Sequence, residues 1–271
     1  MYDIHSHIIY GIDDGSPDID SSRRMLQLAA ESGTRHIVAT PHVIELNNHP
    51  SWDVILQGVN ILQEIVAEEN LKLDIYPGCE LEMNWDMLQL FGKDKRDFCI
   101  NNSRYLLVEL PAMSIPPYAE DFWYELQLKG ITPILAHAER YKLLMEKPRR
   151  LLKWMQAGVL VQINGTSLLG KFGKSAQTSA EQLLKNNCVH FIGSDAHRID
   201  VRNTDLSASR DRLIEIVGNA KAKEICEDNP QKMLADEILS FSVPKQFSTN
   251  EKSKAFGAGF LDKMMLVRRE K

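Results

Sequence analysis

The sequence predicts an α/β protein built on a parallel sheet, most simply a distorted (β/α)7 barrel, with an open doubly wound sheet as the alternative. Seven short runs rich in Ile, Val and Leu recur along the chain, and a helical stretch follows most of them. These runs do not clearly alternate with polar residues, which is typical of strands buried on both faces. The length of 271 residues with 44% apolar content is ordinary for such a barrel as one domain.

The predicted strands are short, and punctuation by Gly, Pro or polar residues separates each from the next segment. In chain order they cover residues 2–4, 36–39, 73–76, 105–108, 132–135, 159–163 and 189–192. The predicted helices cover residues 17–33, 52–70, 118–129, 148–157, 176–186, 206–217 and 230–239. Ser16 before Pro17 predicts the N-cap of the first helix, and Val, Leu and Ile give the second helix an apolar stripe.

The predicted domain covers residues 1–241, and residues 242–271 form a tail of different composition. Small and polar residues dominate this tail, and Arg268, Arg269 and Lys271 make its end basic. Two interpretations remain open for it, a poorly ordered terminus and an arm that contacts a partner. Composition favours the first.

Charge and hydropathy exclude several classes of protein. A net charge of -5 and a pI of about 5.9 give no electrostatic basis for a nucleic-acid partner. No apolar run approaches the ~18 residues needed to span a membrane, so no membrane insertion is expected. The start of the chain has no basic region typical of a signal peptide, and the four cysteines show no C-x-x-C spacing. We therefore expect a cytoplasmic protein with free thiols.

Metal-ligand types stand at or just after the ends of the predicted strands. His5 and His7 follow the first strand, and the two-residue period of a strand would put both imidazoles on one side, within reach of one ion. In a (β/α) barrel the chemistry lies at the carboxyl ends of the strands, where residues far apart in sequence converge. The candidate metal ligands are His5, His7, Asp14, His42, Glu80, Glu109, His137, Asp195 and His197.

Nine nitrogen or oxygen ligands are too many for one ion and suit two or three divalent ions with open positions for water and substrate. Each residue alone has an ordinary structural interpretation, such as a surface histidine or a paired carboxylate. Their joint placement at the strand ends favours the metal site. His36, His49 and His190 lack that placement, so we predict structural positions for them.

Five motifs give the chain a resemblance to a known superfamily. They are Asp3-Ile4-His5-Ser6-His7, Ala39-Thr40-Pro41-His42, Gly78-Cys79-Glu80, Ala136-His137-Ala138-Glu139-Arg140-Tyr141 and Gly193-Ser194-Asp195-Ala196-His197. Over about residues 1–240 the chain resembles the PHP (polymerase and histidinol phosphatase) superfamily. Within it, the chain is similar to the bacterial manganese-dependent protein-tyrosine phosphatases of capsule and exopolysaccharide loci.

The resemblance implies a TIM-like barrel with three metal ions, of which Mn²⁺ is the expected kind and Fe, Zn or Mg are possible. It gives the first ion to His5, His7, Glu80 and Asp195, the second to Glu80, Glu109 and His137, and the third to Asp14, His42 and His197. It further implies that Arg140 and Arg202 bind phosphate and that the substrate is a bacterial tyrosine kinase.

The expected chemistry follows from this ligand set. Divalent ions lower the pKa of water enough to supply hydroxide near neutral pH, and arginine forks take up charge on the phosphoryl oxygens. A phenolate, with a pKa of about 10, leaves without much help from a general acid. The expected catalytic residues are Arg140, Arg202, His42 and Asp14.

Rival functions stay open at this point. A phosphatase with a cysteine nucleophile needs an arginine six residues later, and here those positions hold Trp85, Tyr105, Ser194 and Lys232. A PHP phosphatase of a small metabolite such as histidinol phosphate would share all the metal ligands. A non-catalytic metal-binding kinase partner is a third possibility, and Glu109 in place of a lysine disfavours an amidohydrolase. The sequence does not determine the oligomeric state.

Overall fold

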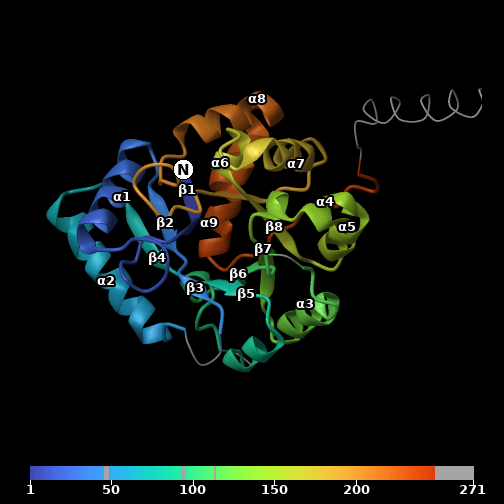
Figure 1. The fold of residues 1–271 in the computed structure, drawn as a ribbon, viewed down its shortest axis with the longest axis horizontal. Helices are drawn as coiled ribbons and strands as arrows, with labels where there is room; N and C mark the ends of the chain where they lie inside the picture. Colours follow the sequence, from blue (N-terminus) through green and yellow to red (C-terminus); the bar gives the residue numbers. More distant parts are fainter. Residues whose placement is uncertain (46–48, 93–94, 113, 248–271) are drawn as a thin grey trace, which may run out of the picture.

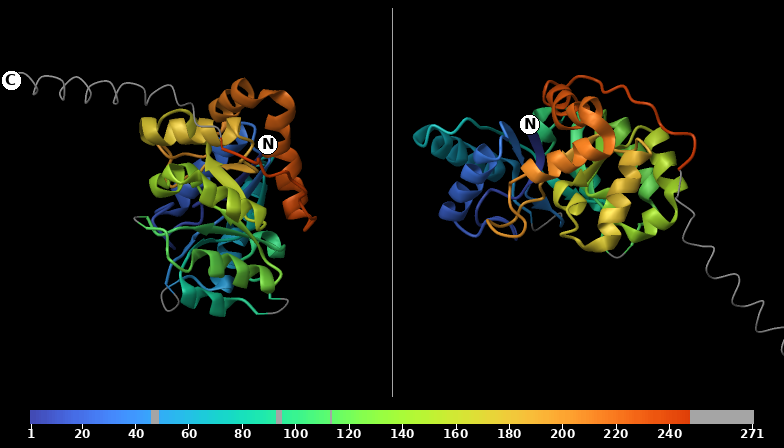
Figure 2. Two further views of the ribbon diagram at one scale, coloured as in Figure 1. Left: turned by 90° about the vertical axis from the view of Figure 1, so that its right-hand side faces the viewer. Right: turned by 90° about the horizontal axis from the view of Figure 1, so that it is seen from above.

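A curled parallel sheet lies at the centre of the molecule, and helices surround it (Figures 1 and 2). This computed structural model describes residues 1–45, 49–92, 95–112 and 114–247. Within these ranges the strands are β1 (Tyr2–Ser6), β2 (His36–Ala39), β3 (His42–Val43), β4 (Asp74–Pro77), β5 (Glu80–Glu82), β6 (Tyr105–Glu109), β7 (Thr132–Leu135), β8 (Leu160–Asn164) and β9 (Phe191–Gly193). Every run predicted as a strand forms one, which confirms the α/β class.

Two of the predicted strands continue as second, shorter strands that the sequence pattern did not predict. β2 resumes as β3 after Thr40 and Pro41, and β4 resumes as β5 after Gly78 and Cys79. The first pieces pair in the order β1-β2-β4, and the second pieces join the order β3-β5-β6-β7-β8-β9, all in parallel. The break brings His42 directly opposite Glu80 in register.

The first and last strands meet at their carboxyl ends. The backbone N–H of Asp195 donates to the carbonyl oxygen of His5 at 2.8 Å, and the N–H of His7 donates to that of Ala196 at 2.9 Å. Ser6 and Ala196 form a parallel bridge there. The sheet therefore curls until β9 lies beside β1.

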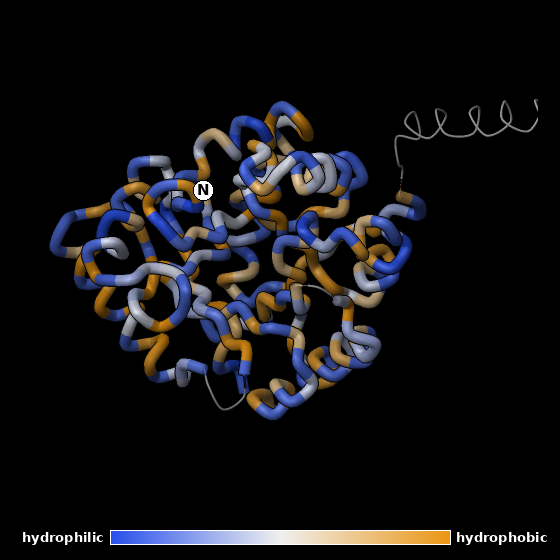
Figure 3. The backbone as a smooth tube through the Cα atoms, viewed as in Figure 1, coloured by the Kyte–Doolittle hydropathy of each residue, from blue (hydrophilic) through white to orange (hydrophobic). Residues whose placement is uncertain are grey.

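The α-helices within the described ranges are α1 (Ile19–Glu31), α2 (Trp52–Glu68), α3 (Ala119–Leu128), α4 (Lys142–Glu146), α5 (Pro148–Gln156), α6 (Gly165–Leu168), α7 (Gly173–Lys185), α8 (Ser207–Lys223) and α9 (Asn229–Leu234). Hydrophobic and hydrophilic residues alternate along them (Figure 3). The strands supply side chains to two apolar clusters: Leu106 and Val108 of β6 to one, Tyr105 and Leu107 to the other. Each such buried side chain contributes about 1.5–3 kcal/mol, and the prediction of strands buried on both faces is confirmed.

Two helix predictions need correction. Asp18, and not Ser16, caps α1, because the Asp18 carboxylate accepts from the Ser21 N–H at 2.8 Å while Ser16 is buried and bonded to Ser22 at 2.9 Å. The last predicted helix, 230–239, ends at Leu234, and the backbone turns at Asp236, whose φ is +56°. The short helices α4 and α6 were not predicted.

Of the predicted tail, residues 242–247 are described, and residues 248–271 lie outside the described residues. Val243 and Phe247 pack against the main apolar cluster. In the described part of the chain, no helix combines the length and the hydropathy needed to cross a membrane.

Candidate metal centre

The nine predicted ligands come together at the carboxyl edge of the sheet. His5 lies in β1, His42 opens β3, Glu80 opens β5 and Glu109 ends β6, while the other ligands lie in the segments that follow β1, β7 and β9. His137 and Asp195 have left-handed backbones, with φ of +31° and +52°. A non-glycine residue adopts this conformation at some cost in energy, and such residues cluster at functional sites.

Glu80 is the centre of the cluster. Its Oε2 lies 3.1 Å from Nε2 of His5 and 3.3 Å from Nε2 of His7, and its Oε1 lies 2.8 Å from Nε2 of His137. Asp195 Oδ1 lies 3.6 and 3.7 Å from the same two nitrogens of His5 and His7. His5, His7, Glu80 and Asp195 thus form one buried group whose ligand atoms are within 4.8 Å of one another.

Two further groups adjoin this one. His7, Asp14, His42 and His197 form the second, in which Asp14 Oδ1 lies 3.4 Å from His42 and 3.3 Å from His197. His42, Glu80 and Glu109 form the third, with His42 Nδ1 3.2 Å from Glu109.

These groups differ in two details from the sets implied by the resemblance. His7 belongs to two of the groups, and His42 joins the carboxylates of Glu80 and Glu109. His137 was expected with those carboxylates, and it lies 2.8 Å from Glu80 and 3.7 Å from Glu109.

The donor atoms fit divalent cations better than they fit one another. Nε2 of His5 and Nε2 of His7 face each other at 3.2 Å. Their Nδ1 atoms face the oxygens of Gln162 and Asp13, so in the neutral rings the proton belongs on Nδ1 and both Nε2 atoms present lone pairs. Glu80 Oε2 is buried among imidazole nitrogens without a hydrogen bond of good geometry. Lone pairs that converge on shared space, with no partner of their own, are what a bound cation satisfies.

Electrostatics supports the same interpretation. Burial alone would raise the pKa of Glu80, but the positive charge of His5 and hydrogen bonds from His137 and other imidazoles hold it well below its usual value. Burial would lower the pKa of His42, but Glu109 and Glu80 raise it to about 9. Burial, together with the charges of His7 and Arg202, lowers the pKa of His197 to about 3. In this state protons on some imidazoles balance the carboxylates, a role that metal cations take over.

Both predicted phosphate-binding arginines donate hydrogen bonds to the carboxylate of Asp195. Arg140 Nη1 donates to Oδ2 of Asp195 at 3.1 Å, and Arg202 Nη2 donates to Oδ1 at 2.6 Å. The Asn164 amide donates to Oδ2 at 2.7 Å. Burial would raise the pKa of Asp195, yet the nearby positive charges, His5 and His137 first, hold it below its usual range. The two arginine side chains, 37% and 29% exposed, therefore lie at the border between the cluster and solvent.

The side chains that orient the ligands were not predicted from the sequence. Asp13 Oδ2 accepts from Nδ1 of His7 at 2.8 Å, which turns the Nε2 lone pair toward the cluster. Gln162 Oε1 accepts from the N–H of His137 at 2.7 Å and lies 3.4 Å from Nδ1 of His5. The only signal for Asp13 was its place beside Asp14, and the alternation along β8 could have put Gln162 on the same face as Asn164.

Replacing Asp13 by asparagine is expected to weaken divalent metal binding by about 10–100-fold, because the charge that fixes the His7 ring is lost. The measurement is a competitive metal titration of the variant, with Asp20→Asn on the exposed side of α1 as the matched control. Native metal affinity in the Asp13 variant would contradict the orienting role.

Cys79, next to Glu80, is not a nucleophile. The side chain is fully buried, and burial, with the charges of Cys99 and Glu80, raises the pKa of the thiol well above its usual value. Cys79→Ser is therefore expected to retain more than about a third of the native rate of phosphoester hydrolysis, with a modest loss of stability from the buried hydroxyl. A loss of 100-fold or more in a folded variant would contradict this.

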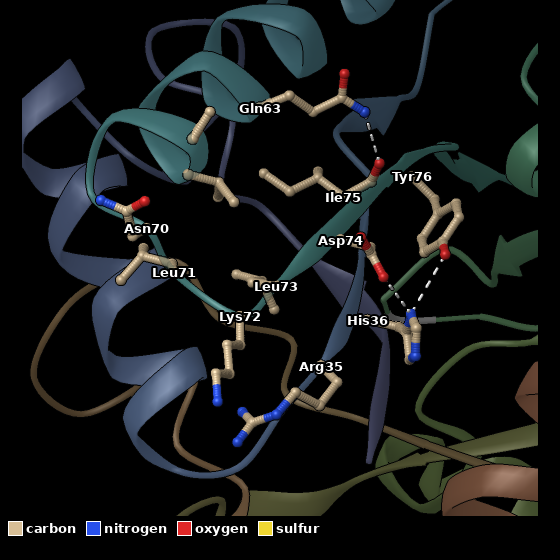
Figure 4. A pocket seen from close by; sticks show the side chains of 12 residues that line it. Arg35, His36, Gln63, Asn70, Leu71, Lys72, Leu73, Asp74, Ile75 and Tyr76 are labelled. Atoms are coloured by element: carbon tan, nitrogen blue, oxygen red, sulfur yellow. Dashed lines mark hydrogen bonds and ion pairs between the residues drawn. The ribbon is translucent and has the colours of Figure 1, made fainter.

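A separate hollow of about 870 Å³ lies at the amino ends of β2 and β4, away from the ligand cluster (Figure 4). Here His36 Nδ1 lies 3.1 Å from Asp74 and 3.3 Å from the Tyr76 hydroxyl, and Gln63 donates to the Ile75 carbonyl at 3.0 Å. His190, also predicted as structural, is buried and its Nδ1 accepts from the Val161 N–H. Neither histidine belongs to the three ligand groups found among the described residues.

The fold and the cluster define a class: α/β proteins with a cluster of metal-ligand side chains at the carboxyl edge of a curled parallel sheet. Among solved structures, that of YwqE from Bacillus subtilis and CpsB from Streptococcus pneumoniae, described as unique metal-dependent tyrosine phosphatases, superimposes with a TM-score of 0.85. It is 30% identical and covers 92% of this chain and 100% of that chain. A family model for capsular polysaccharide synthesis, CpsB/CapC, matches residues 1–235. The chain belongs to this family.

Two more comparisons place the chain among its relatives. The tyrosine-protein phosphatase YwqE of Bacillus subtilis (strain 168) is 35% identical over 205 residues, which are 75% of this chain and 80% of the relative. A histidinol phosphate phosphatase of Lactococcus lactis shares the fold, with a TM-score of 0.53, 17% identity and coverage of 83% of this chain and 94% of that one.

Proposed function

We propose that this chain is a metal-dependent protein-tyrosine phosphatase that acts on a bacterial tyrosine kinase and thereby regulates capsular or exopolysaccharide synthesis. The observation that carries the proposal is the pair of guanidinium groups of Arg140 and Arg202. The carboxylate of Asp195 holds both of them at the border of the cluster of candidate metal ligands. The descriptions of YwqE and CpsB as tyrosine phosphatases support the choice of substrate.

The residues that would hold the ions are the nine histidines and carboxylates. We assign His5, His7, Glu80 and Asp195 to one ion, Glu80, Glu109 and His137 to a second, and Asp14, His42 and His197 to a third. Mn²⁺ is the ion that we propose, and ligation by imidazole and carboxylate without thiolate is compatible with it. Divalent ions bound there supply Lewis acidity and lower the pKa of water.

The arginines bind and orient the phosphoryl group. Their forks match the geometry of phosphoryl oxygens, and their charge is always present, so they stabilise the negative charge that spreads over these oxygens in the transition state. Asp195 keeps both forks on the same side of the cluster. We count His42 and Asp14 with Arg140 and Arg202 as catalytic residues, because their side chains face the third ion position.

The candidate metal centre is accessible from solvent, which supports a protein substrate. The Asp14 side chain is 70% exposed, and together with His42 it lines a shallow hollow of about 280 Å³ at the edge of the cluster. Arg140 lines a hollow of about 330 Å³ on another side. In the described ranges, Asp14 and Arg140 are therefore accessible from solvent to a tyrosine presented on a peptide.

We also propose a distorted (β/α)7 barrel, with β2 and β3 counted as one strand and β4 and β5 as another, and a domain boundary at residues 241/242. The hydrogen bonds between β1 and β9 support the closure. A cytoplasmic location is proposed as well, since Cys79, Cys99, Cys188 and Cys226 are all unpaired.

The decisive experiment compares substrates of the Mn²⁺-reconstituted full chain. We expect kcat/KM for a phosphotyrosine peptide to exceed that for the matched phosphoserine peptide and for histidinol phosphate by at least about 100-fold, since the phenolate is the better leaving group. Preference for histidinol phosphate would replace the proposed function by that of a small-metabolite phosphatase. If the metal-loaded protein hydrolyses none of the three substrates, the proposed function is wrong, and the alternative of a non-catalytic metal-binding protein replaces it.

A further inference from the structure

β8 and the segment that follows it supply none of the nine candidate metal ligands. The turn after α6, the short helix that follows β8, contributes a side chain beside the arginines instead. Residues 169–172 form this turn, and Phe172 is its last residue before α7. The N–H of Lys171 donates to the Thr166 carbonyl at 3.2 Å, and the N–H of Gly173 donates to that of Gly170 at 2.9 Å. Both glycines have left-handed backbones, with φ of +77° and +88°, which favours glycine at these positions. The backbone around Phe172 is therefore fixed.

The same turn is tied to the loop that carries Arg140. Glu139 Oε1 accepts from the Asn164 N–H at 3.1 Å and from the Ser167 hydroxyl at 2.6 Å. Glu139 precedes Arg140 and is buried, so these bonds hold the start of α6 against the arginine loop. The position of Phe172 relative to Arg140 is set by these bonds.

The half-buried ring of Phe172 contacts both arginines. The guanidinium carbon of Arg140 is 4.9 Å from the ring centroid, and that of Arg202 is 5.6 Å from it. Both distances are within the ~6 Å at which a cation interacts favourably with the face of a phenyl ring. Two guanidinium groups from different loops thus share one aromatic ring.

A neutral ring suits this place better than a second carboxylate. The two positive groups repel each other, and in the described ranges Asp195 is the only carboxylate that pairs with either. A further carboxylate would hold them but would also neutralise the charge that the phosphoryl oxygens need. A phenyl ring restricts the rotamers of both side chains and leaves their charge available, so less ordering is required when phosphate binds.

We propose that Phe172 is a positioning residue that preorganises Arg140 and Arg202 for the phosphoryl group. The proposal rests on the proposed function of these arginines and adds a residue that acts through them. It makes the aromatic character of position 172 the property that matters, and not merely its volume.

The test compares Phe172→Leu, which removes the ring, with Phe172→Tyr, which keeps it, in the Mn²⁺-loaded full chain. For Phe172→Leu we expect KM for a phosphotyrosine peptide and the inhibition constant of inorganic phosphate to rise about tenfold, with kcat changed less than about threefold. Phe172→Tyr is expected to keep both constants within about threefold of the native values. Leu169→Ala, in the same turn, controls for general disturbance of the turn and is expected to match the native protein.

A double-mutant cycle decides whether the effect passes through the arginines. In an Arg140→Ala background, Phe172→Leu should raise KM and the inhibition constant of phosphate by a clearly smaller factor than in the native background. The reason is that one of the two arginines that the ring contacts is already absent. The proposal would be overturned if Phe172→Leu raised these constants by the same factor in both backgrounds. It would also be overturned if Phe172→Leu and Phe172→Tyr raised them equally.

Binding of inorganic phosphate, measured by calorimetry on metal-loaded protein, separates this proposal from the proposed function. If the native protein hydrolyses no phosphotyrosine, the proposed function fails, and weaker phosphate binding by Phe172→Leu still supports the positioning role. If hydrolysis occurs and Phe172→Leu binds phosphate as the native protein does, the positioning role alone fails.

Discussion

Removal of divalent cations is expected to lower the rate of phosphotyrosine hydrolysis by a factor on the order of 10³ or more. Among the described residues, three candidate nucleophiles in the centre are poorly placed to attack, since Cys79 is fully buried with a raised pKa, while Glu80 and Asp195 are enclosed by imidazoles and guanidinium groups. The measurement is steady-state hydrolysis after exhaustive chelation and metal analysis, followed by titration with Mn²⁺. Recovery of activity with Mn²⁺ is the expected result.

The same chelation should change the folded protein even where no activity is assayed. Bound cations stabilise only the state in which the ligands are together, so the thermal unfolding midpoint should fall on chelation and rise with added Mn²⁺. Hydrolysis that survives when no metal is detectable would exclude the metal mechanism. An unchanged midpoint would show that the buried cluster binds no cation.

Asp195→Ala is expected to lower kcat/KM by a factor on the order of 10³ or more. The carboxylate lies against His5 and His7 on one side and receives hydrogen bonds from Arg140 and Arg202 on the other. Its loss therefore removes a metal ligand and the anchor of both phosphate-binding groups. The measurement is kcat and KM on a phosphotyrosine peptide, together with the metal content of the purified variant.

Asp200→Ala is the matched control, because Asp200 is an exposed carboxylate in the same segment after β9. It is expected to match the native protein. An Asp195→Ala variant that folds, as judged by circular dichroism, and retains a tenth of the native activity would place the essential ligands elsewhere.

The long elements of the fold could be predicted because each leaves a hydrophobic pattern. β6 and β8 are mostly apolar runs whose side chains are buried on both faces, and α2 buries one stripe. β3 and β5 could not be predicted, since strands of two and three residues that begin with His42 and Glu80 have no hydrophobic period. Their position depends on pairing partners that are distant in sequence.

The convergence of the candidate ligands could be predicted because parallel strands direct their carboxyl ends to one edge. What could not be predicted is how the rings are turned. The orientations of His5 and His7 depend on hydrogen bonds to Gln162 and Asp13, and neither partner is marked by spacing or by a motif. The role proposed for Phe172 depends likewise on a turn geometry that only the three-dimensional arrangement reveals.

The meeting of β1 with β9 has a consequence for biosynthesis. Ser194 donates from its backbone N–H to Asp3, a partner 191 positions earlier in the chain, at 2.9 Å. A ribosome releases β1 long before β9, so during translation that side of β1 is an open sheet edge without its partner. Such distant pairing makes closure of the sheet a late step of folding. A nascent chain therefore carries most of the candidate metal ligands well before Asp195 and His197 complete the centre.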